Sequence, residues 1–386
     1  MTMNRAARDT DESRYSAVRI ADISQFLWHA TEMGPAAAVT PFQTTYWLGP
    51  WFRILAPAKS IEPVLVNVRD KSTGEIAMLL PLVRRRTHGI DLLEFPDLSV
   101  SDYAFPLLGP AAPESSEAAL AAWKAACGCI PNVDLIRLHK LLPAANGKAN
   151  PLAFLPVKPA DTVRNTMYLP KSWDEYLRAR SASFRKELRR HMRTLGEMGG
   201  VECQMLTDVA KAHEALSNLE KFHRKRIEAL GGKYTLHEQP FSRFYHELVE
   251  QGLGSFSLLS IMKAGDRSVA VAYSLLHGLT CTTVRLAYRG DEWDRCSPGV
   301  LLATEIVRWG IKNGLETFDF GAGEYEYKKR IGCEVMPLLS YEKPMTIKGR
   351  LALIARESTD FIRKSQLARR SFNSPDGTLR PPSVPI

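Results

Sequence analysis

Short apolar runs and apolar–polar alternation divide the first half of the chain into strands and helices. Residues 63–70 and 75–83 predict two strands that a polar turn at residues 71–74 joins into a β-hairpin. A helix is expected to begin near Ile20. Further expected elements are strands at residues 92–95, 104–108 and 133–138, and an alanine-rich helix at residues 115–127.

The second half shows the same two periodicities more clearly. Ser172 followed by Glu175 forms a capping box that opens a helix. Strands are expected at residues 165–169, 201–206, 256–263, 268–277, 280–288 and 317–320. Helices are expected at residues 181–198, 208–230, 241–252 and 298–312. The hairpins and the final strand-helix-strand crossover predict a mixed sheet that turns parallel near its end.

The first half repeats this order more faintly, as a hairpin, a helix and a strand. The fold class is therefore α/β, an α+β mixed sheet in two tandem domains of related fold. A Pro/Ala/Gly-rich connection at residues 142–159 is the expected boundary, dividing residues 19–150 from residues 160–345. We expect two separate sheets, one on each side of it.

Both ends of the chain have a different composition. Residues 1–18 and 371–386 are expected to be disordered. Residues 346–370 form a basic segment in which an amphipathic helix is expected from residue 348. This helix either packs back on the N-terminal domain or contacts a membrane surface through its lysines and arginines.

Composition limits the class of protein and its partners. The 386 residues are 45% hydrophobic and 24% charged, as in globular proteins, and the net charge of +9 favours anionic partners. The N-terminus lacks an apolar signal region, and no apolar run reaches the roughly 18 residues of a membrane span, so we expect a cytoplasmic protein. The six cysteines lack zinc-site spacing, so we expect reduced thiols and no metal.

The segment 283–332 contains the most informative chemistry. A strand ends at Tyr288, and Ser297-Pro298-Gly299 begins a helix whose free N–H groups could hold a phosphate. Gly299 permits close approach of a ligand to the backbone, and Arg295 can neutralise phosphate charge. An ordinary capped helix start remains the alternative.

Other polar residues are candidates for acid–base chemistry or substrate binding. Asp319 at a strand end could accept a proton or hold an amine, or it could be a turn residue. Lys328 could hold a phosphate or carboxylate, or lie in a solvated turn. His223, with Arg226 one turn later, could take a proton from an attacking amine or hydroxyl, or be structural.

The helix at residues 181–198 is strongly basic. Arg185 and Arg189 share one of its faces at i, i+4 spacing. This face either is solvated or docks an anionic sugar chain, a nucleotide-linked sugar or tRNA.

The order of strand, phosphate loop, helix and strand resembles the cofactor-binding core of the Gcn5-related N-acetyltransferases (GNAT). In detail, most of residues 20–345 resembles the CelD-like acetyltransferases associated with cellulose and exopolysaccharide synthesis. The matching residues in the second half are Phe184, Arg185, His223, Arg226, Tyr288, Trp293, Ser297-Pro298-Gly299, Leu301, Leu302, Asp319-Phe320-Gly321, Tyr327 and Lys328. Those in the first half are Thr40-Pro41-Phe42-Gln43, Leu80-Pro81-Leu82 and Asp102-Tyr103.

Residues 308–332 also resemble the Fem-type aminoacyl transferases of peptidoglycan synthesis, which have two such domains in tandem. Residues 295–300 contain a single glycine where simpler acetyltransferases have Q/R-x-x-G-x-G/A. The identity of the acyl donor therefore stays open.

The resemblance implies direct transfer from acetyl-CoA or another acyl-CoA to an anionic sugar, polysaccharide or cell-envelope precursor. The implied catalytic residues are His223 or Asp319 as the base and Tyr327 as the proton donor to the thiolate. The implied cofactor-binding residues are Leu286, Ala287, Arg295, Ser297, Gly299, Val300 and Leu301. The implied substrate-binding residues are Arg185, Arg189, Arg226, Tyr288, Trp293 and Lys328.

We expect one cleft bordered by six of these residues and the donor site at the end of the strand 280–288. The six are Arg185, Arg189, His223, Arg226, Asp319 and Lys328. Two alternatives are a Fem-like transferase that uses aminoacyl-tRNA and a non-catalytic scaffold of a polysaccharide export complex. The basic charge suits RNA, but no aromatic stacking pattern is present, so nucleic acid is not the expected partner.

Overall fold

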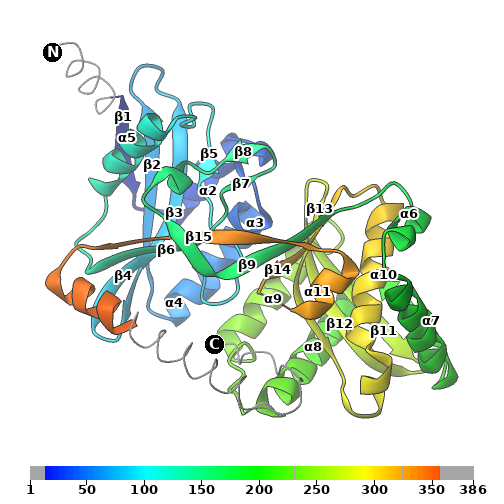
Figure 1. Cartoon of the computed structure of the whole chain (residues 1–386). Coiled ribbons are helices and arrows are strands. Elements are labelled where there is room, and N and C mark those ends of the chain that lie inside the picture. The colour runs from blue at the N-terminus through cyan, green and yellow to red at the C-terminus, as the bar shows by residue number, and fades with distance from the viewer. Residues whose placement is uncertain (1–13, 230, 324, 357–386) are drawn as a thin grey trace.

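The computed structural model describes residues 14–356 with the exception of residues 230 and 324 (Figure 1). Expectations for residues 1–13, for the basic helix beyond residue 356 and for the tail 371–386 lie outside the described residues. The described chain forms two α/β halves joined through one mixed sheet of 13 strands. Its strand order is β1-β2-β3-β4-β6-β15-β9-β14-β13-β12-β11-β10, with β5 paired to β3.

The first half is an antiparallel meander followed by a parallel crossover. Its strands are β1 (Tyr15–Ile20), β2 (Glu62–Asp70), β3 (Ile76–Thr87), β4 (Ile90–Glu94), β5 (Leu107–Leu108) and β6 (Leu135–Leu141). Its helices are α2 (Ile23–Glu32), α3 (Thr45–Pro50), α4 (Ala56–Ala58) and α5 (Ser116–Cys127), with shorter turns of helix at Pro35–Ala37, Pro41–Gln43, Trp51–Leu55 and Pro151–Phe154. The crossover from β4 to β6 contains β5 and α5, and β4 and β6 pair in parallel.

The second half has the same order of elements. Its strands are β10 (Val201–Met205), β11 (Ser257–Ala264), β12 (Arg267–His277), β13 (Thr280–Tyr288) and β14 (Thr317–Ala322). Its helices are α6 (Trp173–Arg178), α7 (Ala182–Glu197), α8 (Val209–Ala229), α9 (Gln239–Gly252), α10 (Pro298–Lys312) and α11 (Glu326–Ile331), with a 3₁₀ helix, η5, at Asp291–Cys296. Helix α10 connects β13 to β14, which pair in parallel as expected.

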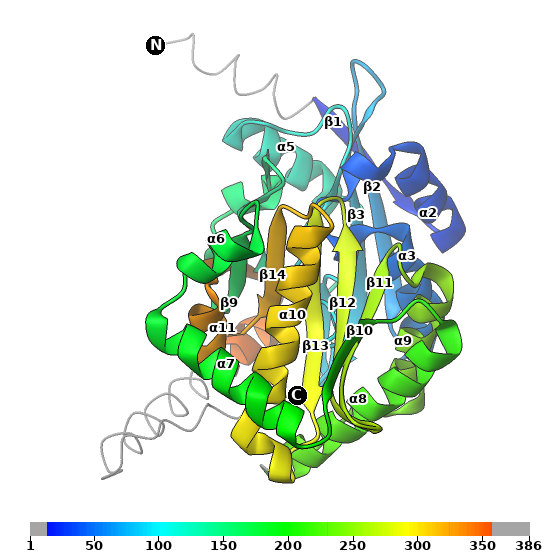
Figure 2. The ribbon, with the colours of Figure 1, turned by 90° about the vertical axis from the view of Figure 1, so that its right-hand side faces the viewer.

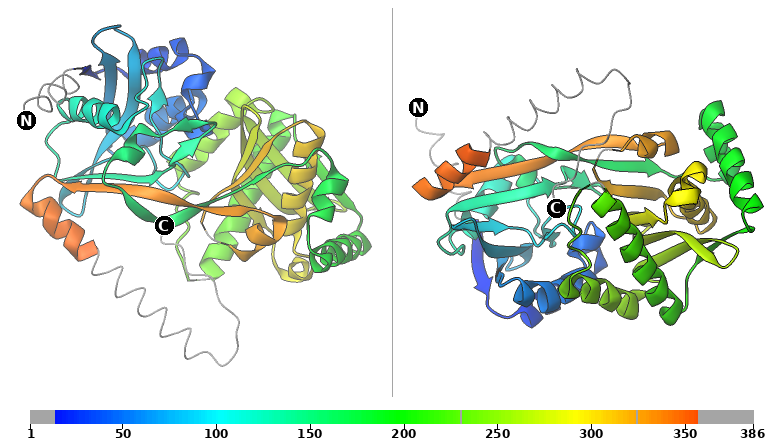
Figure 3. Two further views of the ribbon diagram at one scale, coloured as in Figure 1. Left: turned by 45° about the horizontal axis from the view of Figure 1, so that its top comes forward. Right: turned by 90° about the horizontal axis from the view of Figure 1, so that it is seen from below.

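Two long strands exchange partners between the halves (Figure 3). Strand β9 (Lys158–Tyr168) follows the first half in sequence but pairs with β14 of the second half. Strand β15 (Glu334–Pro344) follows the second half but pairs with β6 of the first half. The two strands also pair with each other. The expectation of two separate sheets divided at residues 142–159 is therefore wrong, because the strand after each half completes the sheet of the other half. The division into domains of residues 19–150 and 160–345 stays a prediction.

Helices cover both faces of the sheet in the second half (Figure 2). Val271, Tyr273 and Leu275 of β12 pack in one core with α8 and α9. The alternate residues Ala270 and Ala272 pack in a second core with α7 and α10. Successive strand residues point to opposite faces, so α7 with α10 and α8 with α9 lie on opposite sides of the sheet.

Several expected boundaries differ from the structure near the termini. Residues 15–18 belong to β1, which pairs with β2, so the expectation of disorder is wrong for them. Helix α2 begins at Ile23, three residues later than expected, because the Asp22 side chain accepts a hydrogen bond from the Ser24 N–H and caps it. The connection at residues 142–159 contains a small hairpin of β7 (Ala144–Ala145) and β8 (Lys148–Ala149).

The described part of the C-terminal basic segment is helical and lies on the first half. Residues 347–356 are helical. Thr346 Oγ1 donates a hydrogen bond to Asp134 Oδ1 at 2.6 Å, and Arg356 pairs with Glu342 of β15 at 2.5 Å. These contacts favour packing on the first half, and contact with a membrane surface stays a prediction. Among the described residues, no helix is long and apolar enough to cross a membrane.

Replacing Leu338 of β15 tests how far the exchanged strand stabilises the first half. Leu338 is fully buried in the core of that half, whereas Met336 of the same strand is 40% exposed. We expect Leu338→Ala to lower the free energy of unfolding by about 2–5 kcal/mol, because it leaves a cavity. The matched control Met336→Ala should change it by less than about 0.5 kcal/mol. Urea unfolding measures the free energy of unfolding of both variants. Equal losses in the two variants would contradict the inference that β15 stabilises the first half through Leu338.

Candidate active site

Strands β13 and β14 separate shortly after they meet. They pair at three positions, Thr280 with Thr317, Cys281 with Phe318 and Thr282 with Asp319. Strand β13 continues to Tyr288, and no pair with β14 beyond Thr282 occurs in the part of the chain that the structure describes. The end of β13 therefore splays from its neighbour, as expected, and we call the β13 segment 283–288 the splayed edge.

A β-bulge in β13 decides which side chains face each side of the sheet. Tyr273 of β12 pairs with Arg285 and Ser274 pairs with Thr283, so Val284 is the extra residue. A bulge shifts the alternation by one residue and re-aims the side chains that follow. Arg285 consequently lies on the α8 side, whereas Leu286 and Tyr288 lie on the α10 side.

The start of helix α10 differs from the phosphate-binding helix start that was expected. Ser297 has a left-handed backbone (φ 45°), and its side chain does not cap the helix. The Val300 and Leu301 N–H groups already donate to the Ser297 carbonyl at 3.0 and 3.2 Å. Because Pro298 has no N–H, the Gly299 N–H is the remaining donor of this first turn.

Gly299 is required here by packing against β13. A Cβ atom on Gly299 would lie 3.0 Å from Leu286 Cδ2 and 3.2 Å from Tyr288 Cδ1. Trp293, an expected substrate contact, is instead 2% exposed within the α10 core. Leu301 is likewise fully buried in that core, and Arg295 is exposed beside it.

His223 of α8 contacts the splayed edge from the opposite face. Its Nε2 donates to the Leu286 carbonyl at 3.1 Å, which leaves Nδ1 unprotonated because a carbonyl can only accept. Nδ1 is buried and has no hydrogen-bond partner among the described residues. Burial, followed by the positive charge of Arg285, lowers the pKa of His223 to about 3. The imidazole is therefore neutral and presents a free lone pair.

Arg285 is the main site residue that sequence reasoning missed. It is 4% exposed, its guanidinium lies 4.5 Å from the centre of the Tyr245 ring, and it donates to the Tyr234 hydroxyl. Its Nε and Nη1 atoms are buried without partners among the described residues, as is Oε1 of nearby Glu220. Arg285 is the only charged residue of the strand Thr280–Tyr288, and this was the available indication.

Asp319 is held in a buried network that joins the two halves. Its Oδ1 accepts from the Tyr103 hydroxyl at 2.6 Å and from the Gly321 N–H at 2.7 Å. Its Oδ2 accepts from Arg164 Nε of β9 at 2.6 Å. Both oxygens are thus occupied, and the residue is 1% exposed. This geometry favours the structural alternative for Asp319 over its role as a base.

Lys328 of α11 lies beside the same network and is not part of a solvated turn. It is 3% exposed, and its Nζ donates to the carbonyls of Ala322 and Gly323 at 3.1 and 3.0 Å. Burial lowers the pKa of Lys328, and the charge of Asp102 opposes this shift. Burial also raises the pKa of Asp102 to about 6.

Tyr327 of α11 packs against the core that α7 and α10 share. Its ring lies edge-on to Phe320, with ring centres 6.2 Å apart. Burial raises the pKa of Tyr327, with a smaller contribution from Tyr325, while the positive charge of Arg226 opposes the rise. The phenol is therefore protonated at neutral pH and can donate a proton.

The expected cleft of six residues does not form. His223 and Arg226 on α8 share the face of the sheet that the N-terminal half covers. Arg185 and Arg189 lie on α7, which packs with α10 on the opposite face, and Arg185 Nη1 donates to the Leu177 carbonyl at 3.2 Å. The expectation is wrong because helix order in the sequence does not determine which face each helix covers.

No group of three or more His, Cys, Asp or Glu side chains suited to a metal occurs within the described residues. Cys296, beside the helix start, is fully buried, and burial raises the pKa of its thiol. It is not placed to act as a nucleophile.

Comparison with known proteins identifies the class of the second half. Residues 182–329 match the family model described as an acetyltransferase (GNAT) domain. The chain thus contains a GNAT-type acyltransferase domain, which confirms that part of the resemblance; the CelD-like family stays a prediction. No match was found among the curated proteins.

Solved structures are similar over nearly the whole described chain. The crystal structure of FemX has a TM-score of 0.57 and 12% identity, covering 84% of this chain and 97% of that one. L-PGS from Bacillus licheniformis has a TM-score of 0.50 and 12% identity, covering 87% and 96%. The C-terminal domain of a putative lysylphosphatidylglycerol synthetase from Agrobacterium fabrum has a TM-score of 0.50 and 10% identity, covering 86% and 95%. At such identities the similarity shows the fold.

Asp319→Asn tests whether the aspartate is structural. The change leaves the partly buried Arg164 guanidinium, whose side chain is 15% exposed, without its counter-charge, so we expect the free energy of unfolding to fall by about 3 kcal/mol. The exposed Asp266→Asn serves as the control and should be near neutral. Chemical denaturation measures both. A fully stable Asp319→Asn protein would show that the network is dispensable for folding and would return Asp319 to the candidate bases.

Proposed function

We propose that the protein transfers an acyl group from acyl-CoA directly to an amine or hydroxyl of an anionic sugar, polysaccharide or cell-envelope precursor. The observation that carries this proposal is the splayed edge of β13, with a bulge at its start and the free Nδ1 of His223 beside it. Main-chain groups without strand partners there require other hydrogen-bond partners. The amide-containing arm of CoA is a suitable partner.

The donor's phosphates would rest near the start of α10. Ser297, Gly299 and Val300 form its first turn, but only the Gly299 N–H is available to an anion. We therefore propose that Arg295, which is exposed next to that turn, neutralises most of the negative charge of the donor's phosphates. Ala287 and Leu286 of the splayed edge would contact the arm of the donor.

The acceptor attacks the thioester carbonyl, and the carbon–sulfur bond breaks. The proton of the attacking group passes to Nδ1 of His223, and Tyr327 protonates the leaving thiolate. Arg285 and Arg226 both lower the pKa of His223 through their charge, after the larger effect of burial. An anionic acceptor beside these arginines would raise the pKa of His223 towards neutral pH, where a general base is most effective. We therefore propose an anionic acceptor rather than a neutral one.

Two outcomes of donor tests would favour other functions. Binding of aminoacyl-tRNA in place of acyl-CoA would support a Fem-like transferase. Absence of binding to either donor would support a non-catalytic scaffold. We also propose that the protein is cytoplasmic. Acetyl-CoA and longer acyl-CoAs are both candidate donors.

The donor site is tested by charge reversal at Arg295. Acetyl-CoA should raise the melting temperature of the wild-type protein, as a native-state ligand does. Arg295→Glu should weaken acetyl-CoA binding by about tenfold or more, equivalent to about 1.4 kcal/mol. The exposed Arg243→Glu on α9, on the opposite face, is the matched control and should bind normally. Calorimetry measures both affinities, and equal affinity in the two variants would remove Arg295 from the site.

The base is tested at His223 with an acceptor found by screening. His223→Ala should lower kcat by about 100-fold or more if Nδ1 takes the proton. The exposed His88→Ala in the turn between β3 and β4 is the control. Because the pKa of His223 is about 3 in the free protein, kcat/KM should show no ionisation of this residue between about pH 5 and 8. An unchanged kcat in His223→Ala would exclude the imidazole from the reaction.

A further inference from the structure

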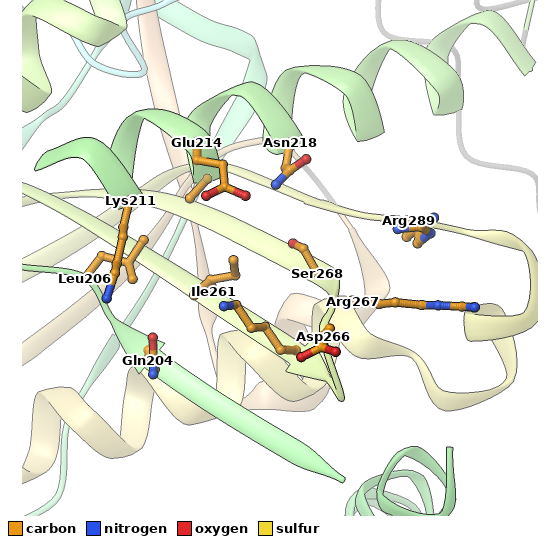
Figure 4. A pocket seen from close by; sticks show the side chains of 12 residues that line it. Gln204, Leu206, Lys211, Glu214, Asn218, Ile261, Asp266, Arg267, Ser268 and Arg289 are labelled. Carbon is orange, nitrogen blue, oxygen red and sulfur yellow. The ribbon is translucent and has the colours of Figure 1, made fainter. Parts of the chain in front are cut away.

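A cavity of about 400 Å³ lies outside the candidate active site, between the start of α8 and the β10–β12 end of the sheet (Figure 4). Its volume lies within the range of small-molecule sites. One wall is a stripe of α8 that includes Lys211, Glu214 and Asn218, spaced so that they share one face. The other wall comes from β11, the turn to β12, and Arg289 directly after β13.

The lining is unusually polar for the space between a helix and a sheet. Four cationic side chains, Lys211, Lys263, Arg267 and Arg289, face two carboxylates, Glu214 and Asp266. The cavity therefore has a net charge of +2. A phosphate monoester carries a charge of about −1.5 to −2 at neutral pH, so its charge matches this excess.

In Figure 4, Arg267 and Arg289 both lie on the side of the cavity away from Lys211. Within the described chain, Arg267 has one ion pair, with Glu292 at 3.4 Å, and both side chains are largely exposed. Exposed pairs of this kind contribute about 0–1 kcal/mol, so a phosphate can replace the Glu292 carboxylate. Arginine is suited to binding phosphate oxygens through more than one hydrogen bond.

The centre of the cavity presents groups that bind hydroxyls. Asn218 and Glu214 point from α8 towards the sheet, and Ser268 points from β12 towards α8 (Figure 4). The Ser268 Oγ atom is buried and has no hydrogen-bond partner among the described residues. A buried hydroxyl without a partner costs free energy, so this atom indicates a missing polar partner. Carboxylate, amide and hydroxyl groups together can satisfy the hydroxyls of a polyol.

We propose that this cavity binds a small polyhydroxylated phosphate monoester, with the phosphate at Arg267 and Arg289 and the hydroxyls at Glu214, Asn218 and Ser268. The site is distinct from the acyl-transfer site, because none of the residues assigned to acyl transfer lines the cavity. The proposal does not depend on the proposed acyltransferase function.

Calorimetry of the full chain with three probes tests the proposal. Glucose 6-phosphate should bind saturably and about tenfold or more tightly than either glucose or inorganic phosphate, since each lacks half of the contacts. The double variant Arg267→Ala/Arg289→Ala should weaken glucose 6-phosphate binding by about tenfold or more. Arg193→Ala is the matched control, because Arg193 is 75% exposed on α7 at the opposite face, and it should bind as the wild type does.

Further variants keep the result interpretable. Both arginines of the double variant are exposed, so its melting temperature should match that of the wild type. Asn218→Ala should weaken binding of glucose 6-phosphate but not of inorganic phosphate. Absence of saturable binding, equal affinity for phosphate and glucose 6-phosphate, or unchanged binding in the double variant would each overturn the proposal.

Discussion

The exchange of β9 and β15 determines how the two halves of this protein fit together. Each half ends in a parallel strand, β6 or β14, whose outer edge needs hydrogen-bond partners. The strand that follows each half in sequence covers the edge of the other half. The result is one sheet without an open edge at its centre, and neither half has its complete set of paired strands alone.

The candidate active site depends on this exchange through a few polar contacts. Arg164 of β9 and Tyr103 of the first half both donate hydrogen bonds to the carboxylate of Asp319. These bonds hold β14 just where it separates from β13. Asp102, also from the first half, lies so close to Gly321 that a Cβ atom there would be 2.4 Å from its Oδ2. The N-terminal half therefore shapes the splay even though the acetyltransferase family model matches only residues 182–329.

The sequence predicts those elements whose pattern is local. Strand β13 and helix α10 have the predicted bounds, because the strand is rich in β-branched and apolar residues, a polar loop follows Tyr288, and Ser297-Pro298-Gly299 begins a helix with a clear apolar stripe. Strand β15 was missed because its first four residues are exposed and its pairing comes from distant strands. The bulge at Val284 could not be predicted either, since it appears only in the register with β12. Without it, neither the position of Arg285 nor the meeting of His223 with the splayed edge could be inferred.

The long-range pairing of β15 also affects how the chain folds during synthesis. His139 of β6 and Ser340 of β15 are hydrogen-bonded across 201 positions. Nearly the whole described chain must therefore be synthesised before the sheet of the first half is complete. Until then, β6 exposes an unpaired edge to neighbouring nascent chains, and such edges promote aggregation. Domain-by-domain folding on the ribosome is thus unavailable to this architecture, and a chaperone that shields the β6 edge would have its greatest effect before residue 344 emerges.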